Sequence, residues 1–292
     1  MTVSLRLGLV FPPSLPPESV RSAALSAEAA GLDDFWVSED CFKESAVASA
    51  VTALAVTERI RVGIALLPVP LRSVAQAAME FATVDRLYPG RFVGGIGHGV
   101  QLWMGQAGAQ AEAPLTLLRE FATALRQLLD GEEVTTAGRY VQLDGVALTY
   151  PPLRPPPLLI GAAGPRSLVA AGELGTGTLL ALGLTTETIE QSAATTLTAA
   201  GDRRGSHEVV ASLIVATGPG ARDRVDAELA GYGMSGGPEV GAVGDAQAIA
   251  ERMRELAAAG VTTIAVQPCA DEPDVGAFAR FLGEEVGPLL RG

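Results

Sequence analysis

Short apolar runs and longer amphipathic segments alternate along the whole of this chain. Runs that are apolar at nearly every position are typical of strands buried on both faces of a parallel sheet. The segments between them repeat their apolar positions at helical spacing. The pattern predicts strands over residues 5–11, 34–37, 60–67, 91–96, 158–162, 177–181, 208–216 and 262–267. It predicts helices over residues 18–30, 44–57, 72–87, 115–129, 167–173, 186–200, 221–229, 245–259 and 275–290.

Eight successive strand–helix units in 292 residues favour a (β/α)8 TIM barrel, an α/β fold, as one domain over residues 1–292. A doubly wound sheet is the alternative, but it usually carries a glycine-rich turn after the first strand. Here that strand runs into Pro12 and Pro13 without a G-x-G-x-x-G sequence. The barrel is therefore the predicted fold.

Two connections are longer than a minimal loop and predict short insertions, after strands four and seven. Segment 130–157 contains a hairpin-like pattern, with strands over 140–143 and 146–149 around Asp144 and Gly145. Segment 231–244 is rich in glycine and is a candidate lid over the barrel.

Composition narrows the class of protein. Apolar residues make up 48% of the chain and charged residues 18%, and the formal net charge is −12. This acidity argues against nucleic acid or an anionic membrane as partner. We find no secretory signal, no stretch of about 20 apolar residues and no cluster with metal-ligand spacing. Cys41 and Cys269 do not make a disulfide framework, so a cytoplasmic protein without a metal is expected.

Active sites of such barrels lie at the carboxyl ends of the strands. After the fifth predicted strand, Gly164 and Pro165 suit a helix start, and Arg166 and Ser167 add a guanidinium, a hydroxyl and backbone N–H groups. Because the positive end of a helix attracts anions, Ala163 and these four residues form a candidate phosphate site. The alternative is an ordinary helix start with a solvated arginine.

Three further residues near strand ends have side chains that could handle a proton. His98, one of two histidines, lies between glycines and could donate to a cofactor ring or move a proton, or it is simply a loop histidine. Glu39 and Asp40 could act as acid or base, or could cap the next helix. His207 falls at the opposite end of the barrel, where a structural role is expected.

Several segments together carry a resemblance to a known family: EAAGLDDFW at 28–36, TERIRVG at 57–63, ATVDRLYPGRF at 82–92, GHG at 97–99 and IGAAGP at 160–165. The chain resembles the luciferase-like superfamily of flavin- and deazaflavin-dependent oxidoreductases. Within it, the chain is most similar to the branch that uses coenzyme F420, which includes methylenetetrahydromethanopterin reductase and F420-dependent glucose-6-phosphate dehydrogenase.

The resemblance implies a barrel that holds the cofactor ring at its carboxyl end, near Gly97. It implies a non-prolyl cis peptide bond between Ala65 and Leu66 that backs the ring. The family's phosphate-binding turn falls on Ala163, Gly164, Pro165 and Arg166, and a homodimer is also implied.

Departures from the family pattern bear on the substrate. Glu39 and Asp40 stand where many relatives have Asp-His, and Val100 stands where some sugar-phosphate dehydrogenases have a carboxylate. Leu67 and Pro68 replace polar residues. We therefore expect an oxidoreductase that moves a hydride between coenzyme F420 and a small, rather apolar organic substrate. The alternatives are a monooxygenase that uses FMN and a flavin-binding barrel without catalysis.

Overall fold

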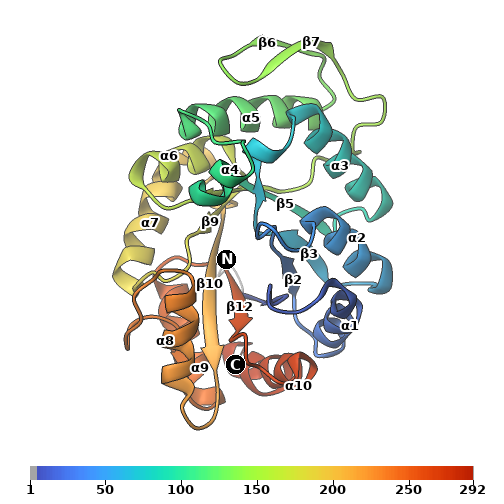
Figure 1. The fold of residues 1–292 in the computed structure, drawn as a ribbon. Coiled ribbons are helices and arrows are strands. Elements are labelled where there is room, and N and C mark those ends of the chain that lie inside the picture. Colours follow the sequence, from blue (N-terminus) through green and yellow to red (C-terminus); the bar gives the residue numbers. More distant parts are fainter. Residues whose placement is uncertain (1–4, 292) are drawn as a thin grey trace.

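The structure is a computed structural model and describes residues 5–291. Eight parallel strands close into a barrel, and helices form a ring around it (Figure 1). The barrel closes because β1 pairs with both β2 and β12, while β10 pairs with both β9 and β12. The barrel strands are β1 (Arg6–Val10), β2 (Asp34–Val37), β3 (Arg61–Ile64), β5 (Phe92–Gly97), β8 (Leu158–Ala162), β9 (Gly177–Leu180), β10 (Glu208–Ala216) and β12 (Thr263–Pro268). The predicted (β/α)8 fold is confirmed.

The outer helices occupy the predicted segments. They are α1 (Val20–Ala29), α2 (Ala46–Val56), α3 (Val74–Leu87), α5 (Pro114–Leu129), α6 (Pro165–Leu174), α7 (Thr186–Ala199), α8 (Ala221–Gly231), α9 (Ala246–Ala258), α10 (Val275–Arg280), the π-helix η4 (Phe281–Val286) and α11 (Gly287–Arg291). Several begin at a polar cap, as at Asp245 and Asp274, whose carboxylates accept the N–H groups of Ala248 and Ala277 at 2.9 Å. None of the helices within residues 5–291 is both long enough and apolar enough to cross a membrane.

Short elements interrupt the regular alternation. The third predicted strand is divided into β3 and β4 (Leu67–Pro68), and the bond between Ala65 and Leu66 is cis, as the resemblance implies. A second non-prolyl cis bond joins Cys41 and Phe42. The remaining short elements are the 3-10 helices η1 (Pro17–Ser19), η2 (Val69–Leu71) and η3 (Gly201–Arg203), the helix α4 (Gln101–Gln106) and the strand β11 (Ala242–Val243), which pairs in parallel with the end of β10.

Both predicted insertions are present, but the hairpin prediction in the first is wrong in its register. The observed antiparallel strands are β6 (Val134–Ala137) and β7 (Gln142–Val146), and Asp144 and Gly145 lie inside the second strand. The turn forms earlier because the Glu120 carboxylate accepts the N–H groups of Tyr140 and Val141, at 2.8 and 3.0 Å. A contact from a distant helix thus outweighs the local Asp-Gly signal.

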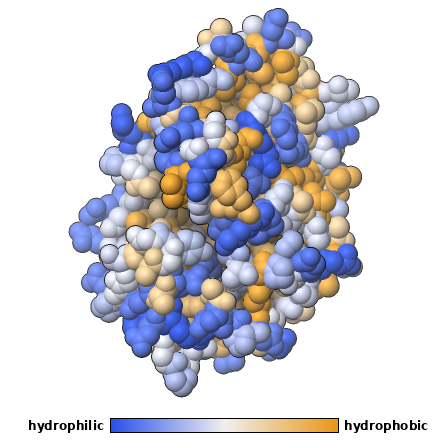
Figure 2. Space-filling view, viewed as in Figure 1, coloured by the Kyte–Doolittle hydropathy of each residue, from blue (hydrophilic) through white to orange (hydrophobic). Residues whose placement is uncertain are grey.

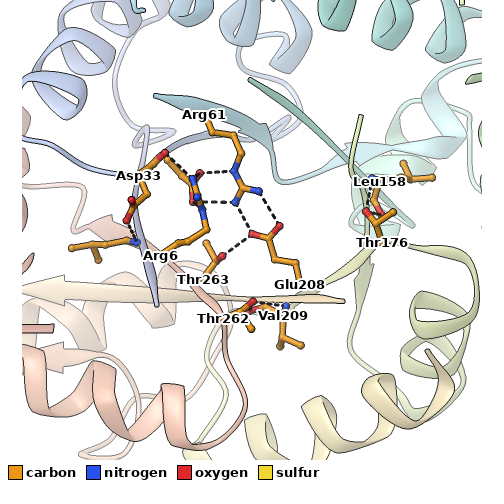
Figure 3. Close-up of polar contacts among 11 residues, drawn as sticks. Arg6, Asp33, Arg61, Leu158, Thr176, Glu208, Val209, Thr262 and Thr263 are labelled. Carbon is orange, nitrogen blue, oxygen red and sulfur yellow. Dashed lines mark hydrogen bonds and ion pairs between the residues drawn. The ribbon is translucent and has the colours of Figure 1, made fainter. Parts of the chain in front are cut away.

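Inward-facing side chains fill the barrel in layers, because alternate residues of each strand point inward. The lowest layer, at the amino ends of the strands, is ionic (Figure 3). Asp34 is fully buried and accepts from Arg6 and Arg61, while Arg61 also donates to Glu208 at 2.6 and 3.0 Å. Thr263 donates to Glu208 at 2.6 Å. These charges are paired and hydrogen-bonded, as buried charges must be.

An apolar layer lies above the ionic one and consists of Val10, Trp36, Val93, Leu159, Leu179, Val210 and Ala265. The Trp36 ring spreads across the two neighbouring strands, where Gly8 and Gly63 leave room for it. A Cβ at Gly63 would lie 2.1 Å from the ring, and one at Gly8 would lie 2.7 Å from its Nε1. The carboxyl end of the barrel is therefore sealed from below by a packed layer.

Candidate functional site

A cavity of about 440 Å³ opens at the carboxyl ends of the strands, directly above the apolar layer. Its volume falls in the usual range for small-molecule sites, roughly 300–1,000 Å³. In six of the eight strands the next inward residue lines the cavity, and these residues are small or polar: Ser38, Ala65, Gly161, Ala181, Ser212 and Gln267. The cavity exists because this layer does not fill the barrel.

Apolar side chains form much of the remaining wall. The Leu66 side chain projects over Gly97 and Gly161, where an added Cβ would come within 2.6 and 2.3 Å of it. Val100 and Trp103, from the segment around α4, also line the cavity. Figure 2 shows apolar side chains over α4 near the centre of this face, and Leu102 of that helix is 69% exposed. The site therefore suits a largely apolar ligand.

Glu39 lines the cavity but is held by protein groups. Its carboxylate makes a bidentate ion pair with Arg72, and the two side chains are 10% and 13% exposed. The same carboxylate accepts the N–H of Ala46, the first residue of α2, at 3.1 Å. Of the two readings of Glu39, the structure favours the one in which it caps the next helix.

Asp40 differs from its neighbour. It also lines the cavity, and it is half-buried. Burial raises the pKa of the Asp40 carboxyl, while the nearby Lys43 charge opposes this rise. A carboxyl in such surroundings holds its proton to a higher pH than a solvated one, which suits a group that exchanges protons.

His98 lines the cavity from the end of β5. Burial lowers the pKa of His98, and a hydrogen bond with the Pro114 backbone partly opposes this effect. The imidazole is therefore neutral near pH 7. Its Nδ1 is buried and has no hydrogen-bond partner within residues 5–291.

The predicted phosphate turn begins at the cavity and leads away from it. Ala163 lines the main cavity, whereas Arg166 and Pro165 line a separate cavity of about 390 Å³ between α5 and α6. The Ser167 hydroxyl accepts the N–H groups of Ala163 and Gly164 at 3.2 and 3.1 Å and donates to the Gly164 carbonyl at 2.9 Å. Ser167 thus shapes the turn, whereas Arg166 is exposed and forms no ion pair with the acidic side chains of residues 5–291.

The structure brings most of the predicted site residues to one place. Six of them line the main cavity: Glu39, Asp40, Ala65, Leu66, His98 and Ala163. Gly97 lies beneath the Leu66 side chain, and the other four predicted residues, 164–167, follow the cavity wall outward. Within residues 5–291, no three His, Cys, Asp or Glu side chains cluster closely enough to hold a metal ion.

The sequence analysis assigned no role to six polar or aromatic cavity residues: Trp36, Ser38, Trp103, Ser212, Tyr232 and Gln267. Because alternate residues of a strand point to the same face, counting inward positions along the predicted strands would have identified Trp36, Ser38, Ser212 and Gln267 as barrel-lining residues. Tyr232 follows α8 in an insertion, and no strand period reaches it. His207 is at the amino end, buried, and bonded to Thr178 at 2.9 Å, in agreement with the structural role expected of it.

A family comparison accounts for this arrangement. The model of the luciferase-like monooxygenase family matches residues 7–234, which is most of the chain and includes most of the cavity wall. The chain belongs to this family. The resemblance predicted from the sequence motifs is confirmed.

Two curated relatives align with more than half of this chain. The chain is 31% identical over 177 residues to the 5,10-methylenetetrahydromethanopterin reductase of Methanolobus tindarius, which covers 60% of this chain and 54% of the relative. It is 32% identical over 173 residues to the F420-dependent glucose-6-phosphate dehydrogenase of Kineococcus radiotolerans, which covers 55% and 51%. The chain spans about half the length of the curated relatives that it matches.

Solved structures of luciferase-like proteins share the whole fold. An F420-dependent secondary alcohol dehydrogenase in complex with an F420–acetone adduct superposes with a TM-score of 0.87 at 19% identity, covering 99% of this chain and 100% of the other. The tetrahydromethanopterin reductase of Methanopyrus kandleri gives a TM-score of 0.84 at 20% identity, covering 98% and 99%. At such identities the likeness establishes the fold.

Proposed function

We propose that this protein is an oxidoreductase that transfers a hydride between coenzyme F420 and a small, largely apolar organic substrate. The observation that carries the proposal is the similarity to curated F420-dependent relatives, at just over 30% identity across more than half of the chain. The barrel cavity supports it with its volume and its apolar wall.

The residues of the cavity fit a deazaflavin ring. The small inward layer provides space above Trp36, and Ala65 and Leu66 form part of the cavity wall. His98 lines the cavity, so its imidazole can lie against the ring. The positive end of α6 and Arg166 favour the anionic part of the cofactor. When bound, the deazaflavin supplies the hydride donor or acceptor.

In this reaction, side chains of the protein would orient the reactants and exchange the proton that accompanies hydride transfer. Asp40 and His98 are the candidates for proton exchange, because each lines the cavity and each has a pKa shifted by burial. Glu39 keeps the loop after β2 in place through Arg72. A homodimer remains a prediction from the family resemblance.

The proposal is tested by turnover with a panel of neutral ketones, aldehydes and alcohols. Reoxidation of reduced F420 under anaerobic conditions, followed by its absorbance, is the expected result. Oxygen consumption that depends on a flavin reductase and FMN would instead support the monooxygenase alternative. Tight cofactor binding with no turnover across the panel would support a non-catalytic barrel.

A further inference from the structure

A hydrogen-bonded cluster outside the predicted site forms one wall of the main cavity. Gln267, the inward residue near the end of β12, is 6% exposed and lines the cavity. Its Nε2 donates to the phenolic oxygen of Tyr232 at 3.1 Å and to Glu228 Oε1 at 3.2 Å. The other Glu228 oxygen accepts the N–H of Ala270 at 2.8 Å. Both hydrogens of the Gln267 amide are thus used, so its orientation is fixed.

Two groups of this cluster are left free to meet a ligand. Because the Tyr232 oxygen accepts from Gln267, its own O–H proton points elsewhere, and it makes no hydrogen bond to any of residues 5–291. The carbonyl oxygen of Gln267 likewise receives no donor from the described part of the chain. Tyr232 and Gln267 both face the cavity, so a donor and an acceptor stand side by side on its wall.

Electrostatics select the kind of group that these residues can bind. Burial raises the pKa of Tyr232 to about 12, the Gln267 hydrogen bond opposes the rise, and the charges of Asp40 and Glu228 add to it. The phenol is therefore protonated at neutral pH and acts as a donor. The same two carboxylates repel an anionic group at this position, so a neutral oxygen is favoured over a carboxylate or phosphate.

The surroundings of the cluster are apolar. Leu182 and Met234 line the cavity on the same side, and Trp103 lines it as well. A ligand that places an oxygen against Tyr232 would therefore have an apolar body.

We propose that Tyr232 and Gln267 form the subsite for the substrate's single polar group, with Tyr232 O–H donating to a neutral carbonyl or alcohol oxygen. The substrate class is then a small apolar carbonyl compound or the corresponding alcohol, and not a sugar phosphate or an acid. That this compound is also the substrate of a hydride transfer rests on the proposed function. The binding of its oxygen by Tyr232 and Gln267 is independent of that function.

The test compares two probes of the same shape, cyclohexanone and methylenecyclohexane, which differ only in an oxygen against a CH2 group. Each is titrated against the wild type and Tyr232→Phe, without cofactor and with F420, by the intrinsic fluorescence of Trp36 and Trp103, which line the cavity. The variant is expected to bind cyclohexanone about three- to tenfold more weakly and methylenecyclohexane unchanged, since one hydrogen bond is lost. Gln267→Met should act in the same direction because it removes the donor that orients the phenol.

Tyr150→Phe is the matched control, since Tyr150 is 70% exposed and does not line the cavity. It should leave both probes unaffected. Equal weakening of both probes by Tyr232→Phe, no weakening of cyclohexanone, or no binding of either probe to the wild type would overturn the subsite. If the oxygen-dependent loss is found but F420 does not bind, the subsite stands and the proposed function fails.

Discussion

At the scale of single residues, the structure separates two carboxylates that are equivalent in the sequence. Glu39 is committed to Arg72 and to the first N–H of α2, whereas burial raises the pKa of Asp40 without a comparable ion pair. The positions of Glu39 and Asp40 in the sequence do not reveal which of them is paired. The pairing depends on the direction of the Arg72 side chain, which comes from the segment just before α3. The candidates for proton exchange reduce to Asp40 and His98.

Glu39→Gln should lower the free energy of unfolding by about 1–3 kcal/mol, because it leaves the Arg72 guanidinium poorly paired and largely buried. Glu80→Gln is the matched control, since Glu80 pairs with the same arginine through one contact at 3.1 Å and is more exposed. Denaturant unfolding of both variants measures the difference. An equal loss from the two substitutions would contradict the positioning role of Glu39.

His207 makes a residue-level prediction about pH. Burial, assisted by the Arg203 charge and opposed by Glu208, lowers the pKa of His207 from 6.5 to about 4. The folded state disfavours the protonated form, so the stabilisation is fully present above pH 6.5 and is lost as the pH falls toward 4. The expected loss is up to about 3 kcal/mol.

The measurement is the difference in unfolding free energy between the wild type and His207→Asn at several pH values. Taking the difference removes the titration of carboxyl groups that both proteins share. The wild type should lose stability relative to the variant as the pH falls from 6.5 to 4. A difference that is constant over this interval would contradict the lowered pKa.

At the scale of elements, the hydrophobic pattern predicts the barrel strands closely. The bounds of β2, β8 and β10 agree with the prediction at both ends, because buried parallel strands leave continuous apolar runs. The division of the third strand at Ala65–Leu66 came from the family resemblance, since an apolar run looks the same whether or not it is interrupted. The hairpin failed because its turn is fixed by Glu120, a residue from another element.

The start of α6 carries a prediction about cofactor affinity. Arg166→Gln should weaken F420 binding by about tenfold at low ionic strength, and by less at high salt, because it removes a cation from the positive end of the helix. Arg59→Gln, which changes the net charge equally at an exposed position of the opposite end, is the control. Fluorescence titration at two salt concentrations gives both affinities. Equal effects of the two variants would remove Arg166 from the site.

At the scale of the whole molecule, the ion pairs that stabilise the barrel and the cavity that would bind ligands lie at opposite ends of its axis. Asp34, Arg61 and Glu208 form the ionic layer at the amino end (Figure 3). An apolar layer follows, and the cavity lies above both. This order follows from the inward positions of the strands and could be predicted from the sequence. The contact between Tyr232 and Gln267 could not be predicted from the sequence, because it depends on how the segment after α8 folds back over the barrel.

The cofactor assignment is tested by a fluorescence titration of the protein with coenzyme F420, run beside one with FMN. We expect saturable binding of F420 in the micromolar range, tighter than that of FMN. Preferential binding of FMN would contradict the F420 assignment and favour oxygen-dependent chemistry. Binding of neither cofactor would leave the barrel fold in place and remove the case for a hydride-transfer enzyme.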